Sequence, residues 1–446
     1  MKNLLLLSII ILAGCASQHQ ASVADPAESF SPAPPPPPFL PSMTRLAVSS
    51  SGSQGNNHSA EPSVSSTGRW VAFGSLASNL VPNDTNGRAD VFVRDRSNGF
   101  TERVSLSSGS DSHAGDQGNN SSFQPDISAD GQHVAFLSWA TNLAGPCCDD
   151  VQVYLRNRLD QSTQRVSVSS AEVSGDSYSF HPSVSANGRY VAFDSDATNL
   201  VGGDTNGTSD VFVRNTVAGT TVRVSVKSDG TQADLAAEEP SISDDGRFVA
   251  FETRSALVAS DTNGAVDVYV WDRVTGLTSP VSVTSAGAFV PEQSRAAAIS
   301  GDGTKVAFWS DASSLVSGDT NAREDVFVRD LSAGTTVRVS LGTGGVQANG
   351  GSRDPSLSTD GAKVTFHSHA TNLVVNDTND RTDVFVVTPA TGAITRASVA
   401  ISGQPDNSSL DSEISGNGRV VVFFSFASNL VSGDTNGVPE VFARRE

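Results

Sequence analysis

The sequence predicts an all-β protein that is built from seven copies of one four-stranded unit. A Val-Ala-Phe string or a close variant recurs along the chain at intervals of 57 to 63 residues. Each copy holds four short apolar strings between glycine-containing turns, and none shows helical periodicity. Short strands that repeat in this way are typical of a β-propeller. We therefore expect a seven-bladed β-propeller of four-stranded blades, with the repeated phenylalanines at Phe73, Phe136, Phe193, Phe251, Phe308, Phe366 and Phe423.

The first and second strands of each unit are predicted to form a hairpin. In the third unit the string Ser183–Ser185 precedes Val191–Phe193, and Asn187-Gly188 lies between them. Asn-Gly and Asp-Gly pairs favour the tight hairpin turns that need a positive φ angle. The same arrangement recurs in other units, with turns at Asp130-Gly131, Asp360-Gly361 and Asn417-Gly418.

The third and fourth strands follow the hairpin in each unit. The third string alternates Val and Phe, as in Val91–Val93, and the fourth commonly reads Arg-Val-Ser, as in Arg103–Ser105. The second and third strings are apolar on both faces. This pattern indicates that both faces of a blade are buried against the neighbouring blades.

The two ends of the predicted propeller complement each other. The seventh unit ends after its third string, Val441–Ala443, and a spare fourth string, Thr44–Ser49, precedes the first unit. We expect this N-terminal strand to complete the last blade. The open edge between the first and last blades is then removed.

The N-terminal residues predict a lipid-anchored protein of the cell envelope. Lys2 and the apolar run Leu4–Leu12 are typical of a signal peptide, because a membrane-spanning helix needs about 20 apolar residues. The string Leu12–Cys15 resembles a bacterial lipobox, which implies cleavage before Cys15 and lipidation of that cysteine. The alternative is an ordinary secretory cleavage site. The resemblance, with Ala16 after the cysteine, implies sorting to the outer membrane.

Three segments are expected along the chain. Residues 1–14 are the signal peptide, residues 15–42 a lipidated, disordered tether rich in proline, and residues 43–446 the propeller. The tether contains the run Pro34–Pro38, and such runs adopt an extended polyproline II conformation. The lipid is the only expected contact with the membrane.

The chain is acidic. Its 446 residues include 48 Asp and Glu against 29 Lys and Arg, which gives a formal net charge of −19. This balance argues against a nucleic-acid partner, because phosphate binding needs clustered lysines and arginines. The sequence has no Gly-x-Gly-x-x-Gly phosphate-binding loop and no Gly-x-Ser-x-Gly elbow of a serine hydrolase.

A second repeated motif, Asp-Thr-Asn-x-x-x-Asp/Glu, follows the second strand in six of the units. Its first, third and seventh residues supply only oxygen ligands, which suit Ca²⁺. The alternative is a structural turn, in which Asp and Asn side chains bind backbone amides and the last acid caps the next strand. The predicted calcium ligands are Asp84, Asn86, Asp90, Asp204, Asn206, Asp210, Asp261, Asn263, Asp267, Asp319, Asn321, Asp325, Asp377, Asn379, Asp383, Asp434, Asn436 and Glu440.

The second unit departs from this motif and carries Cys147 and Cys148 instead. Adjacent Cα atoms lie about 3.8 Å apart, which is below the usual distance for a disulfide. A bond between the two cysteines would therefore be strained, and two free cysteines or an intermolecular bond are the alternatives. His367 and His369 lie two residues apart on a strand and point to the same side. They either share a metal ion or are solvated or hydrogen-bonded side chains, and the latter interpretation is favoured.

The repeat resembles the propeller repeats of TolB-like and WD-type proteins of the bacterial envelope. The resemblance rests on Ser-x-Asp/Asn-Gly-Arg-x-Val-Ala-Phe strings such as Ser185–Phe193, and it covers residues 44–446. It implies the fold and no particular function, because TolB looks like a six-bladed propeller with an α/β domain that this chain lacks. Oligogalacturonate lyases are also propellers, with a histidine-bound metal, but the histidines here show no clustering that implies such a site.

The connections between strands two and three and between blades leave a blade on the same side, here called the loop face. Long polar loops and more than half of the net charge make it the expected working surface. We expect a binding or scaffold protein, not an enzyme, that is monomeric and presents this face to a periplasmic or surface protein or to a glycan.

Two alternatives remain for the loop face. The first is an enzyme, a carbohydrate lyase or hydrolase at the mouth of the central channel. A convergent cluster of histidine, acid and arginine there, with a bound metal, would favour this alternative. The second is that the acidic face serves mainly solubility.

Overall fold

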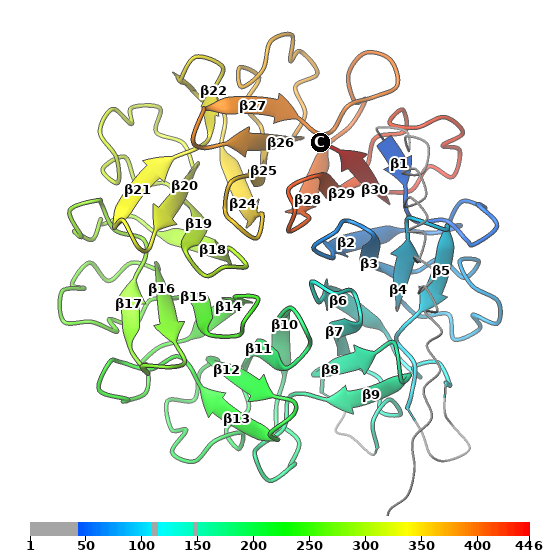
Figure 1. Cartoon of the computed structure of the whole chain (residues 1–446), viewed down its shortest axis with the longest axis horizontal. Coiled ribbons are helices and arrows are strands. Elements are labelled where there is room, and N and C mark those ends of the chain that lie inside the picture. Colours follow the sequence, from blue (N-terminus) through cyan, green and yellow to red (C-terminus); the bar gives the residue numbers. More distant parts are fainter. Residues whose placement is uncertain (1–42, 109–114, 146–149) are drawn as a thin grey trace, which may run out of the picture. The chain divides into compact units, whose positions relative to one another are not determined.

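The computed structural model describes residues 43–108, 115–145 and 150–446. In these residues, seven four-stranded sheets surround a common axis (Figure 1). The prediction of a seven-bladed β-propeller is confirmed. The predicted signal peptide and the tether with Cys15 lie outside the described residues, as do Cys147 and Cys148. The described part of the chain contains no helix that could cross a membrane.

Each blade runs from an inner first strand to an outer fourth strand, with antiparallel neighbours. The first three blades consist of β2 (Ser59–Val64), β3 (Trp70–Ser75), β4 (Asp90–Asp95) and β5 (Phe100–Arg103); β6 (Ser122–Ile127), β7 (His133–Ser138), β8 (Gln152–Asn157) and β9 (Ser162–Arg165); and β10 (Ser179–Val184), β11 (Tyr190–Ser195), β12 (Asp210–Asn215) and β13 (Thr220–Arg223).

The next three blades follow the same order. They consist of β14 (Ala237–Ile242), β15 (Phe248–Thr253), β16 (Asp267–Asp272) and β17 (Thr278–Pro280); β18 (Ser294–Ile299), β19 (Lys305–Ser310), β20 (Asp325–Asp330) and β21 (Thr335–Arg338); and β24 (Ser352–Leu357), β25 (Val364–Ser368), β26 (Asp383–Thr388) and β27 (Ala393–Arg396). The short hairpin of β22 (Leu341–Gly342) and β23 (Val346–Gln347) connects the fifth and sixth blades.

The predicted closure of the ring is confirmed. The seventh blade contains β28 (Ser409–Ile414), β29 (Val420–Ser425) and β30 (Glu440–Arg445), and its outermost strand is β1 (Met43–Arg45). Met43 pairs with Arg444, and the backbone nitrogen of Leu46 donates to the Val441 oxygen at 2.8 Å. Leu46 is only 2% exposed, so the N-terminal strand is part of the core.

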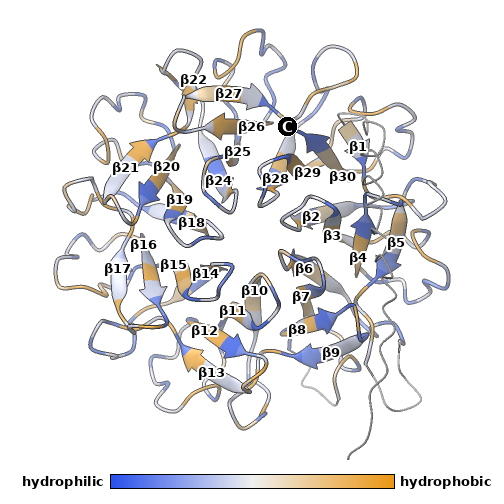
Figure 2. Cartoon of the chain, viewed as in Figure 1, coloured by the Kyte–Doolittle hydropathy of each residue, from blue (hydrophilic) through white to orange (hydrophobic). Residues whose placement is uncertain are grey.

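Aromatic pairs fill the centre of the blades. The repeated Phe of the second strand faces an aromatic residue of the third strand, with ring centroids 5.8–6.4 Å apart in the seven described pairs. Other apolar side chains pack between blades: Val91 and Val93 of β4 join Ile127 and Val134 of the second blade in one cluster. Figure 2 shows hydrophilic ends beyond the hydrophobic stretches of β4, β20 and β30. Burial on both faces explains why these strands lack polar alternation.

Candidate functional site

An irregularity in the first strand of every described blade shapes one end of the central channel. Each first strand has a register shift after its second residue, and its third residue has a φ angle between +46° and +55°. Bulges of this kind re-aim a side chain, and left-handed backbone at non-glycine residues costs about 1–3 kcal/mol. The backbone repeats while the side chain changes from blade to blade: Glu61, Gln124, His181, Glu239, Ala296, Asp354 and Asp411.

These residues line a cavity of about 540 Å³ on the loop face, here called the mouth. Four of them are acids, Glu61, Glu239, Asp354 and Asp411, and burial raises the pKa of each. Within the described residues, no lysine or arginine forms an ion pair with any of the four. The mouth is therefore an acidic cavity whose four carboxyls form no ion pair with a described lysine or arginine, although the charge of His181 acts on Glu239 and that of Arg353 on Asp354.

His181 and Asp194 form a charged pair at the mouth. The Nδ1 atom of His181 lies 2.8 Å from Oδ1 of Asp194, which also accepts from the backbone nitrogen of Glu239. Burial alone would lower the pKa of His181, but the hydrogen bond and charge of Asp194, helped by Glu239, raise the pKa to about 9. His181 is thus a cation at neutral pH, and its partner Asp194, in the same blade, is bonded in turn to the backbone of the next blade.

Glu252 and Arg295 form a second pair, from the fourth and fifth blades. Nη1 of Arg295 donates to Oε1 of Glu252 at 2.7 Å, and the backbone nitrogen of Ala296 donates to Oε2 at 2.8 Å. Burial, followed by the charge of Glu239, raises the pKa of Glu252 to about 7. This carboxyl can hold or release a proton near neutral pH, as general acid–base chemistry requires.

His367 is a buried and neutral residue near the mouth. It is 8% exposed, and burial lowers its pKa to about 4. Its Nδ1 atom lies 3.8 Å from Asp354 and has no hydrogen-bond partner among the described residues. His369 instead contacts Thr382 Oγ1 through Nδ1 at 2.9 Å. The two histidines therefore have different neighbours, and nothing described here supports a shared metal ion.

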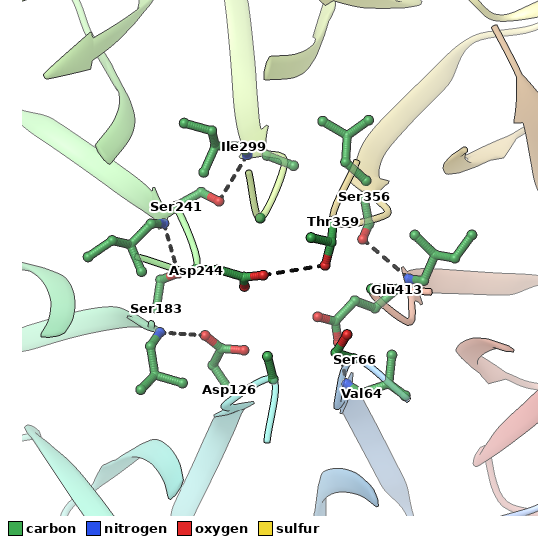
Figure 3. Close-up of a pocket in the computed structure, with 18 of the residues that line it drawn as sticks. Val64, Ser66, Asp126, Ser183, Ser241, Asp244, Ile299, Ser356, Thr359 and Glu413 are labelled. Atoms are coloured by element: carbon green, nitrogen blue, oxygen red, sulfur yellow. Dashed lines mark hydrogen bonds between the residues drawn. The ribbon is translucent and has the colours of Figure 1, made fainter. Parts of the chain in front are cut away.

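The other end of the channel is surrounded by a ring of hydrogen bonds between neighbouring blades (Figure 3). The fifth residue of a first strand accepts from a backbone nitrogen of the next blade, as Ser241 Oγ does from Ile299 at 3.1 Å. Six of the seven blades make this bond, through Ser63, Asp126, Ser183, Ser241, Ser356 and Glu413. The fifth blade has Ala298 at this position, which has no oxygen to accept from Leu357.

Two acids of this ring interact strongly. Ser63 Oγ donates to Asp126 at 3.0 Å and also lies beside Glu413, and a cavity of about 290 Å³ adjoins them. Burial raises the pKa of Asp126 to about 6, and burial together with the charge of Asp126 raises the pKa of Glu413 well above its usual range. Asp126 and Glu413 together therefore retain a proton at pH values at which isolated carboxyl groups are ionised.

The Asp-Thr-Asn motifs form polar clusters that join neighbouring segments of the loop face. In the first blade, Nη1 of Arg103 lies 3.2 Å from both Asp84 and Asp90. Asn86 Nδ2 donates to Asp90 and to the Gly118 oxygen of the following loop, each at 3.0 Å. An arginine from the fourth strand thus occupies the space between the two acids, where a calcium ion was predicted.

The same arrangement recurs in four other blades. The arginines that bridge the first and last acids there are Arg45, Arg223, Arg338 and Arg396. In the fourth blade Pro280 takes the arginine's place, and the Tyr269 hydroxyl donates to Asp261. No group of three or more His, Cys, Asp or Glu side chains in the described chain is placed to hold a metal ion. The geometry favours the structural turn, and calcium binding by the motif residues stays a prediction.

The residues of the mouth are not among the candidate residues that the sequence motifs indicate. His181, for example, lies within β10 and belongs to no repeated motif of polar residues. One signal was present: in five units the left-handed residue precedes a proline, as in Glu61-Pro62 and His181-Pro182. A proline inside a strand cannot donate to the ladder and marks a bulge or an edge.

Comparisons with known proteins show a shared fold. No protein-family model matches the chain, and no curated protein matches its sequence. An oligogalacturonate lyase in complex with manganese matches with a TM-score of 0.53 and 11% identity, over 90% of this chain and 92% of that one. The β-propeller domain of the Trilobed protease from Pyrococcus furiosus matches with a TM-score of 0.52 and 10% identity, over 87% and 95%. TolB from Acinetobacter baumannii has a TM-score of 0.41 and 15% identity, over 76% and 63%.

The chain shares the β-propeller fold of the lyase and of the protease domain. At such low identities these likenesses establish architecture alone. The protease domain is described as having an open velcro topology. In the present chain, by contrast, β1 pairs with β30 and closes the ring.

The expectation that the protein is not an enzyme is wrong. It rested on the absence of a recognisable catalytic motif, but the solved chains that share this fold over most of their length include a lyase. The mouth also brings His181 together with four acids, and Arg295 pairs with Glu252 next to the lining residue Ala296.

Proposed function

We propose that this protein is an enzyme that hydrolyses carbohydrate chains at the mouth. The observation that supports this proposal is the presence of two charged pairs near Glu239 of the fourth blade. His181–Asp194 belongs to the third blade, and Glu252–Arg295 joins the fourth blade to the fifth. The pairs hold ionisable groups with pKa values of about 9 and about 7, and the charge of Glu239 acts on both groups. Paired groups with different proton affinities are typical of acid–base catalysis.

Hydrolysis of a glycosidic bond needs a proton donor and a base. At neutral pH, Glu252 with its pKa of about 7 is protonated in about half of the molecules. We assign it as the acid that protonates the leaving oxygen while the carbon–oxygen bond breaks. Glu239 is assigned as the base that takes a proton from the attacking water, whose oxygen joins the sugar carbon.

The charge of the mouth favours hydrolysis over elimination. A carbohydrate lyase cleaves beside the carboxylate of a uronic acid, and that anion would meet Glu61, Glu239, Asp354 and Asp411. Only His181 among the residues that line the mouth carries a positive charge. A neutral or cationic sugar therefore fits this cavity better than an anionic one.

The proposal includes a location in the cell envelope. It rests on the Leu12–Cys15 string, which supports lipidation of Cys15 and a tether that carries the propeller at the membrane surface. A glycan of the periplasm or the cell surface is then within reach. Labelling with radioactive palmitate tests the anchor: the wild type should incorporate label, and C15S should not.

The activity is tested by measuring the release of reducing ends from defined oligosaccharides. Oligomers of glucosamine, N-acetylglucosamine and galacturonate are each incubated with the wild type, E252Q, E239Q and the control E172Q, which changes a glutamate outside the mouth. We expect E252Q and E239Q to lower kcat by about 100-fold or more, and E172Q to leave it unchanged. Activity of the wild type should fall above pH 7, where Glu252 loses its proton. Equal turnover by E252Q, or cleavage of galacturonate oligomers alone, would contradict the proposal.

A further inference from the structure

The side chains around the mouth differ between two sides of the ring. On the second and third blades the residue before the left-handed position is aromatic, Phe123 and Phe180. On the fourth, fifth and sixth blades the same position holds Glu238, Arg295 and Arg353. The residues next to the lining of the cavity are therefore aromatic on one side of the ring and charged on the other.

Three aromatic residues on the first of these sides lead toward the mouth. Trp139 and Tyr178 meet edge to face with their ring centroids 5.8 Å apart, and Tyr178 stacks on Phe180 at 6.1 Å. The ring of Phe180 in turn lies 6.1 Å from that of His181. Tyr178 is 38% exposed, while Trp139 and Phe180 are half-buried against the core of the second and third blades. We call Trp139, Tyr178 and Phe180 the aromatic strip.

The opposite side of the mouth holds polar groups whose bonding capacity is not used by the protein. Asp354 and Asp411 are acids without an arginine or lysine partner in the described residues. The hydroxyl of Ser412, a residue that is 7% exposed, lines the mouth and has no hydrogen-bond partner in the described chain. The buried Nδ1 atom of His367 is unpartnered as well. A ligand that supplies positive charge and hydrogen-bond donors fits this side.

We propose that the substrate is an oligosaccharide of amino sugars, whose rings lie along the aromatic strip and whose protonated amino group meets Glu239, Asp354 and Asp411. This inference rests on the proposed function and names its substrate class. The apolar face of a pyranose ring packs on an aromatic face, and Tyr and Trp add polar groups at their edges. An ammonium group pairs with carboxylates through charge-assisted hydrogen bonds. The strip leads to His181, so a chain bound on it places one sugar in the mouth.

Binding is measured by calorimetry with E252Q, which prevents turnover and leaves the strip and the four mouth acids in place. The probes are the dimer and hexamer of glucosamine, the hexamer of N-acetylglucosamine and the hexamer of galacturonate. We expect the glucosamine hexamer to bind about tenfold more tightly than the N-acetylglucosamine hexamer, and the galacturonate hexamer to bind most weakly.

Variants separate the two sides of the mouth. In the E252Q background, Y178A and W139A should weaken binding of the glucosamine hexamer about tenfold and leave binding of the dimer unchanged. D411N should remove the preference for glucosamine over N-acetylglucosamine, and Q124E, which adds a carboxylate to the ring, should strengthen that preference. V375A changes an exposed apolar residue outside the mouth and serves as the control. Because Tyr178 is exposed, Y178A tests the strip even if W139A fails to fold.

Three outcomes would overturn the inference, and they are distinguishable. Equal binding of all hexamers, with no effect of Y178A, contradicts the inference and leaves hydrolysis at the mouth in place. Binding of Mn²⁺ or Ca²⁺ alone that D411N abolishes would assign the acids to a metal ion instead. No binding and no cleavage of any oligosaccharide would refute the proposed function itself.

Discussion

One gap in the ring of hydrogen bonds at the end of the channel opposite the mouth gives a quantitative prediction. Six described blades connect to the next through a side-chain oxygen, and Ala298 leaves Leu357 without such an acceptor. In A298S the new hydroxyl takes the position that Ser241 and Ser356 occupy in their blades. The adjoining cavity of about 290 Å³ leaves space for one more oxygen atom.

The expected gain follows from the value of one hydrogen bond. A net contribution of about 0.5–1.5 kcal/mol is typical, so that A298S should raise the free energy of unfolding by about 1 kcal/mol. The matched variant S241A removes the acceptor of the Ile299 nitrogen and should lower it by about 1–3 kcal/mol. The two changes exchange the same pair of residues in opposite directions.

Urea denaturation is the suitable assay. An entropy of unfolding of about 2 cal/mol/K per residue over about 400 residues converts 1 kcal/mol into a change of only about 1 °C in Tm. The urea midpoints of the wild type, A298S and S241A, with the m-value checked for constancy, resolve such a difference. The reasoning is refuted if S241A lowers stability while A298S leaves it unchanged or lowers it.

Three further predictions concern stability. Deletion of residues 43–50 removes the buried Leu46 and Val48 and the pairing of β1 with β30; it should cost at least about 3 kcal/mol in urea denaturation, and unchanged stability and solubility would contradict the closure. Burial raises the pKa of Asp126 from 3.8 to about 6, so the folded state binds this proton more tightly than the unfolded chain. The free energy of unfolding should therefore fall by about 2 kcal/mol as the pH rises from 4 to 7. D126N should flatten this dependence when denaturation is compared at pH 5 and pH 7.5, and an unchanged slope would exclude Asp126 as its source. R338M leaves the buried Asp319 and Asp325 without their cation and should lower the free energy of unfolding by about 3–5 kcal/mol. Calcium titration of the wild type tests the alternative. If no heat of binding is measured and EDTA does not change the melting temperature, calcium binding at the motif is rejected.

Packing made the fold predictable. A buried aromatic pair in each blade requires Phe or Tyr at fixed places, and the hairpin beside it requires a residue such as Gly188 that adopts a positive φ angle. These requirements repeat in every unit and produce the periodic strings. The missing fourth strand at the C-terminus and the spare string at Thr44–Ser49 made the closure predictable for the same reason.

The mouth was not predictable in the same way. Its side chains occupy one backbone position per blade but share no residue type, and residues such as His181 and Asp354 are far apart in the sequence. The Asp-Thr-Asn motif left two interpretations open for a different reason. Its oxygen atoms fit both a calcium site and a turn. The turn is favoured by Arg103, whose position in a predicted strand gave no hint that its guanidinium lies between Asp84 and Asp90.

The register shift near the start of each first strand is a repeated backbone feature, whereas the side chain that follows it varies from blade to blade and lines the cavity. The side chains at this position line the cavity, although Ala296 also packs against the core and Glu61 accepts from the backbone nitrogen of Gln124 in the next blade. Each blade thus contributes one variable side chain to the cavity from a repeated backbone position. New ligand preferences can arise by single substitutions at these seven positions, and the cavity can be redesigned by substitutions at the same positions.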